Sequence, residues 1–346
     1  MKLLKYIFLF VPIVTFAQRG GIGSFEFLNN YTNARIAALG GSAIATSHND
    51  ASLVINNPGL LYATLDKQLT FNYLKYFGDI GSGYVGYAFN TKKAGPLMIG
   101  LQYMNYGNFD KKDIDNNNLG SFAANDFAFH ISNSRTIKKW NVGATAKLVY
   151  SVLEYYNSVG IAADIGATYK NKDSLFVFSA VVNNLGYQIT TYTGGDRQLY
   201  PFNIQMGFSK KFAHNPLRIS IIAHNLQKFG NLLYQNSNKN NRNIDLSTGN
   251  AIEEDFTVLS YTMSHIIFST EILLGKKLNL RFGYNDLRRR ELALIDARTS
   301  AGFSWGFGIK VNKFMFSYGS ASFYSGNATN HFSINTNLQE FYKKKN

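Results

Sequence analysis

A Gly-x-Ser-x-Gly pattern at residues 302–306 matches a motif of nucleophilic catalysis. In hydrolases this motif places the serine on a sharp turn between a strand and a helix. Around Ser304, however, large apolar and small residues alternate on both sides, so the chain should continue as a strand without that turn. We interpret the two glycines as small positions on one face of a strand, and we expect no enzyme. A hydrolase with Ser304 as its nucleophile is the alternative, which mutation of Ser304 tests.

The other side chains that could hold a metal or a cofactor do not gather into a recognisable site. No cysteine is present to supply a thiolate ligand. The six histidines have no spacing typical of metal ligands. The sequence also contains no phosphate-cradling loop and no paired carboxylates. We therefore expect no catalytic residue, no metal and no cofactor.

Four arginines gather in one segment near the C-terminus: Arg288, Arg289, Arg290 and Arg298. Guanidinium groups bind phosphates and carboxylates through paired hydrogen bonds. This loop is therefore a candidate contact for an acidic partner or for anionic lipopolysaccharide, although a solvated basic loop beside lipid phosphates explains the same residues. The Asn-rich segment 227–263 is a second candidate docking loop. Nucleic acid is not an expected partner despite the net charge of +14, because the lysines are spread over many turns.

The first 17 residues have the pattern of a secretory signal peptide. Lys2 and Lys5 flank the start of an apolar run over 6–16, and a small-residue cleavage site ends at Ala17. The run is too short for a membrane-spanning helix, which needs about 20 residues. No later stretch is apolar enough for such a helix, so any passage through a membrane should use strands.

The composition and a period-2 alternation together indicate many strands. Hydrophobic residues make up 45% of the chain, aromatic residues 15% and charged residues only 16%, which excludes a disordered protein. From residue 68 onward, apolar side chains alternate with small or polar ones, as in strands with two different faces. We predict fourteen strands, at 68–76, 82–91, 96–106, 124–135, 140–152, 157–170, 174–184, 203–212, 217–226, 264–275, 277–285, 301–310, 313–321 and 329–340.

The connections between these strands fall into two classes. Links from even to odd strands are short and mostly carry lysine, whereas links from odd to even strands include the long ones at 107–123, 185–202, 227–263 and 286–300. Tight turns at one end and long loops at the other are typical of outer-membrane barrels, and a soluble sandwich gives no reason for such sorting. We therefore predict an all-β fold, a 14-stranded antiparallel transmembrane barrel in residues 67–346. The charged residues Lys147, Asp164, Glu271, Arg281 and Lys310 fall on the small and polar face of these strands, so we expect them to face the lumen. With an even strand number, both termini lie at the tight-turn end, which would be periplasmic.

Residues 18–66 do not alternate like strands. They contain two helix-compatible stretches, at 31–39 and 49–56, and a breaker at Asn57-Pro58. Side chains fill the lumen of an eight-stranded barrel, but a barrel of fourteen strands is wider and would leak if it were empty. We expect this segment to fold into the lumen as a partly helical hatch. A periplasmic arm is the alternative.

Three short motifs stand out in this segment: Arg35 to Gly41, Asn49 to Ala51, and Asn57 to Leu61. Together with a barrel of about fourteen strands, they resemble the FadL-type outer-membrane proteins, especially the PorV and PorQ branch found in the type IX secretion system. FadL-type proteins carry an Asn-Pro-Ala element in their hatch, and Gly59 departs from it. The glycine-rich opening at 20–28 looks closer to PorQ than to PorV. The residues that carry the resemblance are Arg35, Gly40, Gly41, Asp50, Asn57 and Pro58.

The resemblance implies a non-enzymatic component in the outer membrane of a Gram-negative bacterium. In the attachment complex of this family, PorU, PorV, PorQ and PorZ process exported cargo bearing a C-terminal sorting domain and link it to lipopolysaccharide. A PorQ-like protein would anchor PorZ at the membrane, with outer-membrane lipid and lipopolysaccharide around it. The alternative that the same hatch suggests is a FadL-like channel for hydrophobic small molecules, with an apolar pocket in its lumen.

Overall fold

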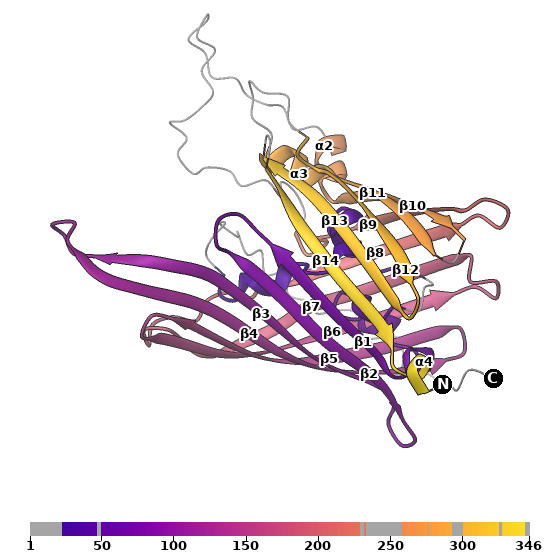
Figure 1. Ribbon diagram of the computed structural model, residues 1–346, viewed down its shortest axis with the longest axis horizontal. Coiled ribbons are helices and arrows are strands. Elements are labelled where there is room, and N and C mark those ends of the chain that lie inside the picture. The colour runs from indigo at the N-terminus through magenta and orange to yellow at the C-terminus, as the bar shows by residue number, and fades with distance from the viewer. Residues whose placement is uncertain are drawn as a thin grey trace, which may run out of the picture.

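Fourteen antiparallel strands close into one barrel in the computed structural model (Figure 1). The structure describes residues 23–46, 50–228, 232, 258–275, 277–292, 300–324 and 327–342. Each strand pairs with its neighbours along the chain, and β1 pairs with β14 to complete the ring, which confirms the predicted fold. The strands are β1 Gln68–Lys75, β2 Gly81–Thr91, β3 Gly95–Lys112, β4 Asn118–Ile137, β5 Trp140–Leu153, β6 Tyr156–Lys170, β7 Phe176–Thr190, β8 Asn203–Lys211, β9 Leu217–Ala223, β10 Ile266–Leu274, β11 Leu278–Asn285, β12 Phe303–Val311, β13 Phe314–Tyr324 and β14 Asn327–Asn337.

The helices are short and lie either inside the barrel or at its ends. They are α1 Ala34–Ala38, α2 Val258–Ser264, α3 Asp286–Leu292 and α4 Gln339–Tyr342, with 3₁₀ turns η1 Glu26–Asn29, η2 Ala51–Leu53, η3 Pro58–Leu60 and η4 Ala63–Leu65. Among the described residues, no helix has the length and apolar character needed to cross a membrane. The predicted signal peptide, 1–17, lies outside the described residues, as do Arg298 and most of the segment 227–263.

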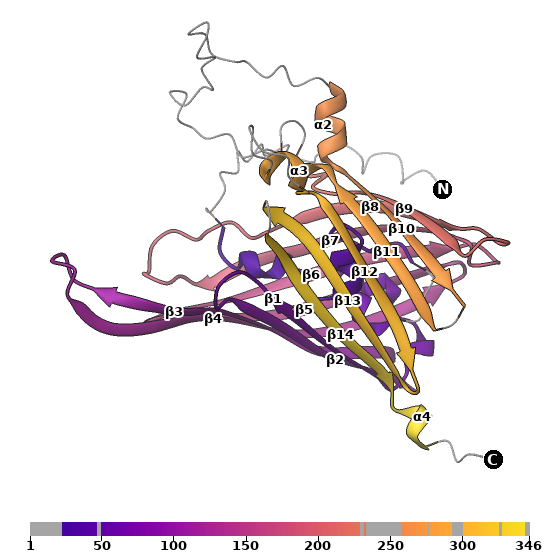
Figure 2. The same cartoon turned by 45° about the horizontal axis from the view of Figure 1, so that its top comes forward.

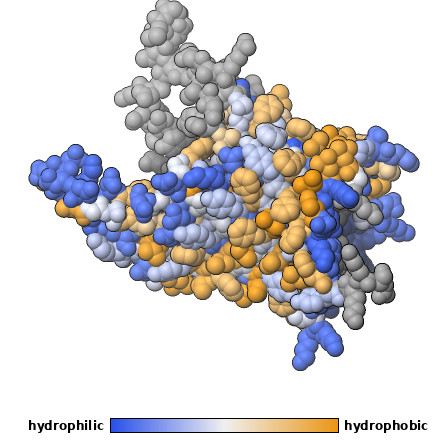
Figure 3. All heavy atoms as spheres, viewed as in Figure 1, coloured by the Kyte–Doolittle hydropathy of each residue, from blue (hydrophilic) through white to orange (hydrophobic). Residues whose placement is uncertain are grey.

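The outer face of the barrel is apolar and the inner face is polar. In β5, Leu148 points outward and is 54% exposed. The preceding residue, Lys147, points into the barrel and is only 5% exposed. The same alternation runs through the other strands, and apolar side chains cover much of the outer surface (Figure 3). A soluble protein would place these side chains in a core. An exposed apolar wall around a polar interior is the arrangement of a barrel that crosses a bilayer.

All four segments predicted to be long loops contain some regular structure. β7 continues to Thr190, inside the predicted loop 185–202, and α2 lies at the end of the predicted loop 227–263. The predicted loop 107–123 is largely a two-stranded ribbon, in which β3 and β4 continue past the ends of β2 and β5 and project from the barrel (Figure 1). The ring of Phe109 stacks on that of Phe122 at 5.3 Å, which holds the two strands together beyond their neighbours. The predicted loop 286–300 begins with helix α3.

The residues before β1 fold inside the barrel, where Figure 2 shows the short indigo helices enclosed by the strands. Helix α1 begins after Asn33, whose side chain accepts hydrogen bonds from the backbone of Arg35 and Ile36. It ends where Gly40 and Gly41 take positive φ values of 88° and 102°, a conformation that glycine adopts at helix ends without strain. We call the described residues between 23 and 66 the hatch.

Candidate functional site

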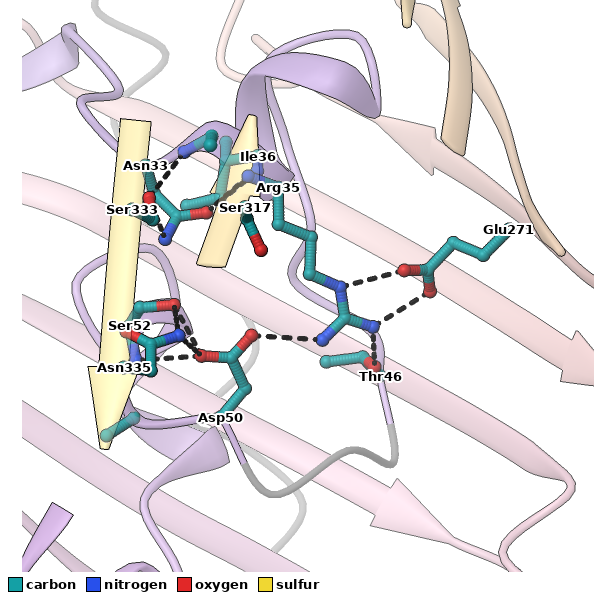
Figure 4. A network of polar contacts seen from close by, with 12 residues as sticks. Asn33, Arg35, Ile36, Thr46, Asp50, Ser52, Glu271, Ser317, Ser333 and Asn335 are labelled. Carbon is teal, nitrogen blue, oxygen red and sulfur yellow. Dashed lines mark hydrogen bonds and ion pairs between the residues drawn. The ribbon is translucent and has the colours of Figure 1, made fainter. Parts of the chain in front are cut away.

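The centre of the hatch is fixed to the barrel wall by a buried ion network (Figure 4). The Arg35 guanidinium, from α1, donates two hydrogen bonds to Glu271 of β10, both of 2.8 Å. It also donates to Asp50 Oδ2 and to Thr46 Oγ1, each at 3.2 Å. Burial alone would lower the pKa of Arg35, but Glu271 and Asp50 hold that pKa above its ordinary value. The paired hydrogen bonds between the guanidinium and the carboxylate hold the two side chains in a fixed arrangement inside the lumen.

The wall supplies two more arginines to the same carboxylate. Glu271 lies directly opposite Arg218 of β9 and Arg281 of β11 in the strand register. Their guanidinium nitrogens lie 3.1 and 3.3 Å from its oxygens. All three wall residues are buried. The Glu271 carboxylate is thus shared by three buried guanidinium groups, one of which also pairs with Asp50. Breaking a buried ion pair by removing one partner typically costs about 3–5 kcal/mol.

The Asn57-Pro58 element is fixed to a second part of the wall, formed by β5 and β6. The Asn57 amide donates to Thr168 Oγ1 at 3.0 Å and to the Ile44 carbonyl at 2.7 Å. The backbone reaches the wall so closely that a Cβ atom at Gly143 would lie 2.2 Å from the Pro58 carbonyl oxygen. Only glycine permits that approach. Asn57 and Pro58, two of the motif residues identified in the sequence, therefore fix the hatch to the wall.

The Gly-x-Ser-x-Gly pattern is part of the wall that holds α1. Ser304 lies in β12, and its hydroxyl donates to the Ala38 carbonyl at 3.2 Å and to the Gly283 carbonyl at 3.3 Å. A Cβ atom at Gly306 would lie 2.7 Å from the Cβ atom of Ala38. Gly306 thus provides a small position against a helix, and the strand continues after Ser304 as predicted. On the other side the prediction is wrong, because β12 begins only at Phe303 and Gly302 lies in the preceding turn with a φ of 89°.

Replacing Ser304 with alanine should leave the barrel assembled and any cellular function intact. We expect the free energy of unfolding to fall by about 1 kcal/mol, because the single hydroxyl proton that the Ala38 and Gly283 carbonyls share is lost. Urea unfolding of the purified barrel measures this change. Ser132→Ala, which removes a comparable buried bond to Thr145 in the wall, is the control. Full loss of function in Ser304→Ala, with unchanged stability, would instead indicate a nucleophile.

Three of the four arginines predicted to form a binding loop lie in helix α3, and their side chains do not form one exposed cluster. Arg288 is turned inward and is only 7% exposed. It donates to the Tyr31 hydroxyl and, at 3.0 Å, to the Gly40 carbonyl, so it is a further anchor of the hatch. Arg290 instead pairs with Asp286 at 2.5 Å. Asp286 at the helix start and arginines near its end suit the helix dipole, a signal that could have predicted α3.

A cavity of about 490 Å³ lies between the hatch and the end of the barrel that carries α3. Amide side chains dominate its polar lining, among them Asn30, Asn56, Asn184, Asn203, Gln205 and Asn285. Arg288 and Glu291 of α3 also border it. Apolar side chains share the lining, among them Leu28, Ile36, Ile55, Leu74, Ile267 and Phe323, so the cavity is amphipathic.

Other functional groups lie in the lumen as the alternation predicted. Glu271, Arg281 and Lys147 were expected to face the lumen by parity, and they do, but their pairing with hatch residues or with each other was not foreseen. Lys147 forms an ion pair with Asp164 at 2.7 Å. Among the described residues, no cluster of three or more possible ligands could hold a metal ion.

Comparison with known proteins gives similarity at the level of barrel architecture. No family model matches the chain, and no curated protein matches it. A Pseudomonas aeruginosa FadL homologue aligns over 89% of this chain and 98% of its own, with 12% identity and a TM-score of 0.46. The KdgM porin gives 4% identity, a TM-score of 0.31 and coverages of 78% and 98%. CdiB from Acinetobacter baumannii gives 10% identity, a TM-score of 0.37 and coverages of 78% and 59%.

Proposed function

We propose that this protein is a plugged outer-membrane barrel that anchors partner proteins, and that it belongs to a type IX secretion attachment complex as its PorQ-like component. One observation carries the anchoring role: the motif residues that suggested the family are the ones that fix the hatch to the wall. Arg35 binds Glu271 and Asp50, Asn57 binds Thr168, and Pro58 is packed on the wall. A plug held by several buried polar contacts suits a scaffold better than a conduit.

In this proposal the short turns face the periplasm and the long loops face the cell surface. The surface end then presents the β3–β4 ribbon, α2 and α3 as the structured part of the docking area. Val258 and Leu259 of α2 are 81% and 70% exposed, which is unusual for apolar residues outside a lipid-facing wall. PorZ is the expected partner at this end, with PorU and PorV in the same assembly. The support for these partners is the resemblance of the hatch motifs to those of the PorQ-like proteins.

A FadL-like channel for hydrophobic small molecules is the second candidate, and the 490 Å³ cavity is the observation in its favour. The lining mixes apolar side chains with amides, and a hydrocarbon ligand would leave those amides without hydrogen-bond partners. Purification in a mild detergent followed by lipid extraction distinguishes the two. The channel requires a hydrophobic molecule retained in the lumen, whereas the anchor requires none.

Deleting the gene should leave exported cargo with unprocessed sorting domains and should release PorZ from the outer membrane. Both follow if the barrel is the membrane anchor of the attachment complex. Immunoblots of membrane and medium fractions measure both effects, and copurification from outer membranes asks whether PorZ, PorU or PorV comes with the barrel. Complementation with Ser304→Ala should restore the wild-type pattern. Normal processing and membrane-bound PorZ in the deletion strain would contradict the proposal.

A further inference from the structure

Four lysines line one cleft at the short-turn end of the barrel. Lys138 and Lys139 come from the turn between β4 and β5, and Lys170 and Lys172 come from the end of β6 and the turn after it. The two turns are neighbours because β5 pairs with β6, and the Lys170 backbone donates to the Lys139 carbonyl at 3.2 Å. The cleft has a volume of about 210 Å³. We call it the rim cleft.

The four ammonium groups have no carboxylate to balance them. Within the described ranges, none of the four forms an ion pair, although ion pairs occur elsewhere in the barrel, and Asp173 in the same turn pairs with none of them. Like charges gathered around one cleft repel one another. An anion that enters the rim cleft would replace that repulsion with attraction.

Aromatic side chains flank the rim cleft and indicate its level relative to the membrane. On the inner side, the Lys170 ammonium lies 3.6 Å from the centroid of the Tyr62 ring, a cation–π contact with the hatch. On the outer side, Trp140 is 41% exposed and packs against Tyr169 and Phe178. More aromatic pairs lie near the short turns of other strands: Tyr87–Phe89, Phe176–Phe208 and Phe314–Phe316. Such a girdle marks the level of the lipid headgroups.

We infer that the rim cleft binds the phosphate headgroup of an anionic phospholipid. The lysines supply the charge, and Trp140 brings the cleft to the wall that faces lipid. This inference rests on the proposed placement of the barrel in a bilayer. A lipid is a better occupant than an acidic peptide, because the cleft borders the aromatic girdle, where phosphates of the adjacent leaflet lie.

Fluorescence quenching by brominated lipids tests this inference. The chain has two tryptophans, so Trp305→Phe leaves Trp140 beside the rim cleft as the reporter. In nanodiscs of phosphatidylcholine, we expect brominated phosphatidylglycerol to quench Trp140 at a mole fraction about fivefold or more below that needed with brominated phosphatidylcholine, because one lysine near a surface enriches an anionic lipid by about that factor. Lys138→Gln with Lys139→Gln should remove most of this preference, and added salt should weaken it.

The paired lysines of another short turn provide the matched control. Lys92→Gln with Lys93→Gln removes the same charge from the turn between β2 and β3, which does not line the rim cleft, and should keep the preference. Equal quenching by the two lipids in the Trp305→Phe protein would overturn the inference, as would equal losses in both double variants. Loss of the preference on adding millimolar inorganic phosphate alone would show a site for free phosphate instead. Because the assay uses only purified barrel and lipid, its failure is distinct from a failure to bind partner proteins.

Discussion

Replacing Glu271 with glutamine should release the hatch from the wall. The change keeps the shape of the side chain but removes the charge that balances Arg35, Arg218 and Arg281. We expect the free energy that holds the hatch in place to fall by about 3–5 kcal/mol, since three buried guanidinium groups lose their shared carboxylate. Protease cleavage of the hatch in reconstituted protein measures this. The cleavage rate should rise by roughly a hundredfold to a few thousandfold, since every 1.4 kcal/mol is about tenfold.

An exposed ion pair in the same barrel provides the control for this variant. Glu340 pairs with Lys310 at 3.2 Å, but both side chains are 39% exposed. Glu340→Gln should change the free energy of unfolding by at most about 1 kcal/mol and leave cleavage of the hatch unchanged. If Glu271→Gln were as resistant to protease as the unmodified protein, the ion network would not be what holds the hatch.

Replacing Gly143 with alanine should displace the Asn57-Pro58 element. The added Cβ would lie 2.2 Å from the Pro58 carbonyl oxygen. That oxygen is a backbone atom and the position of the Cβ is fixed by its own backbone, so no side-chain rotation relieves the clash. The displaced turn would also lose the bonds from Asn141 to the carbonyls of Gly59 and Leu61. We expect a loss of about 3 kcal/mol, the upper end for overpacking, because several contacts fail together. Urea unfolding and cleavage of the hatch measure it.

Gly83→Ala is the matched control for this substitution. Gly83 also lies in a strand, but a Cβ atom there would meet only the Asn72 carbonyl oxygen, at the ordinary distance of 3.5 Å. This variant should unfold within about 0.5 kcal/mol of the unmodified protein. Equal stability of Gly143→Ala and Gly83→Ala would mean that the hatch does not approach the wall as closely as described.

The sequence was sufficient to predict the barrel because its two faces have different chemistry. Alternation in segments such as 140–152 and 157–170 shows which side chains face lipid, and this pattern does not depend on distant contacts. Parity also placed Lys147, Glu271 and Arg281 in the lumen. The ribbon of β3 and β4 was missed because its polar residues suit a loop as well as a strand, and the Phe109–Phe122 stack forms only after the strands pair.

The anchors of the hatch could be predicted only in part. The motif drew attention to Arg35 and Asn57, but not to their partners. Glu271 is more than 200 positions away from Arg35, and the two meet only because the register of β9, β10 and β11 aligns Arg218, Glu271 and Arg281. The inward turn of Arg288 depends likewise on the position of Tyr31 inside the closed barrel.

Conductance across a planar lipid bilayer tests most directly whether the anchored hatch closes the barrel. The anchored hatch predicts that the unmodified barrel, once inserted, shows no steady open-channel current, and that Glu271→Gln shows discrete openings as the hatch leaves the wall. A steady porin-like current through the unmodified protein, equal to that of Glu271→Gln, would contradict the account.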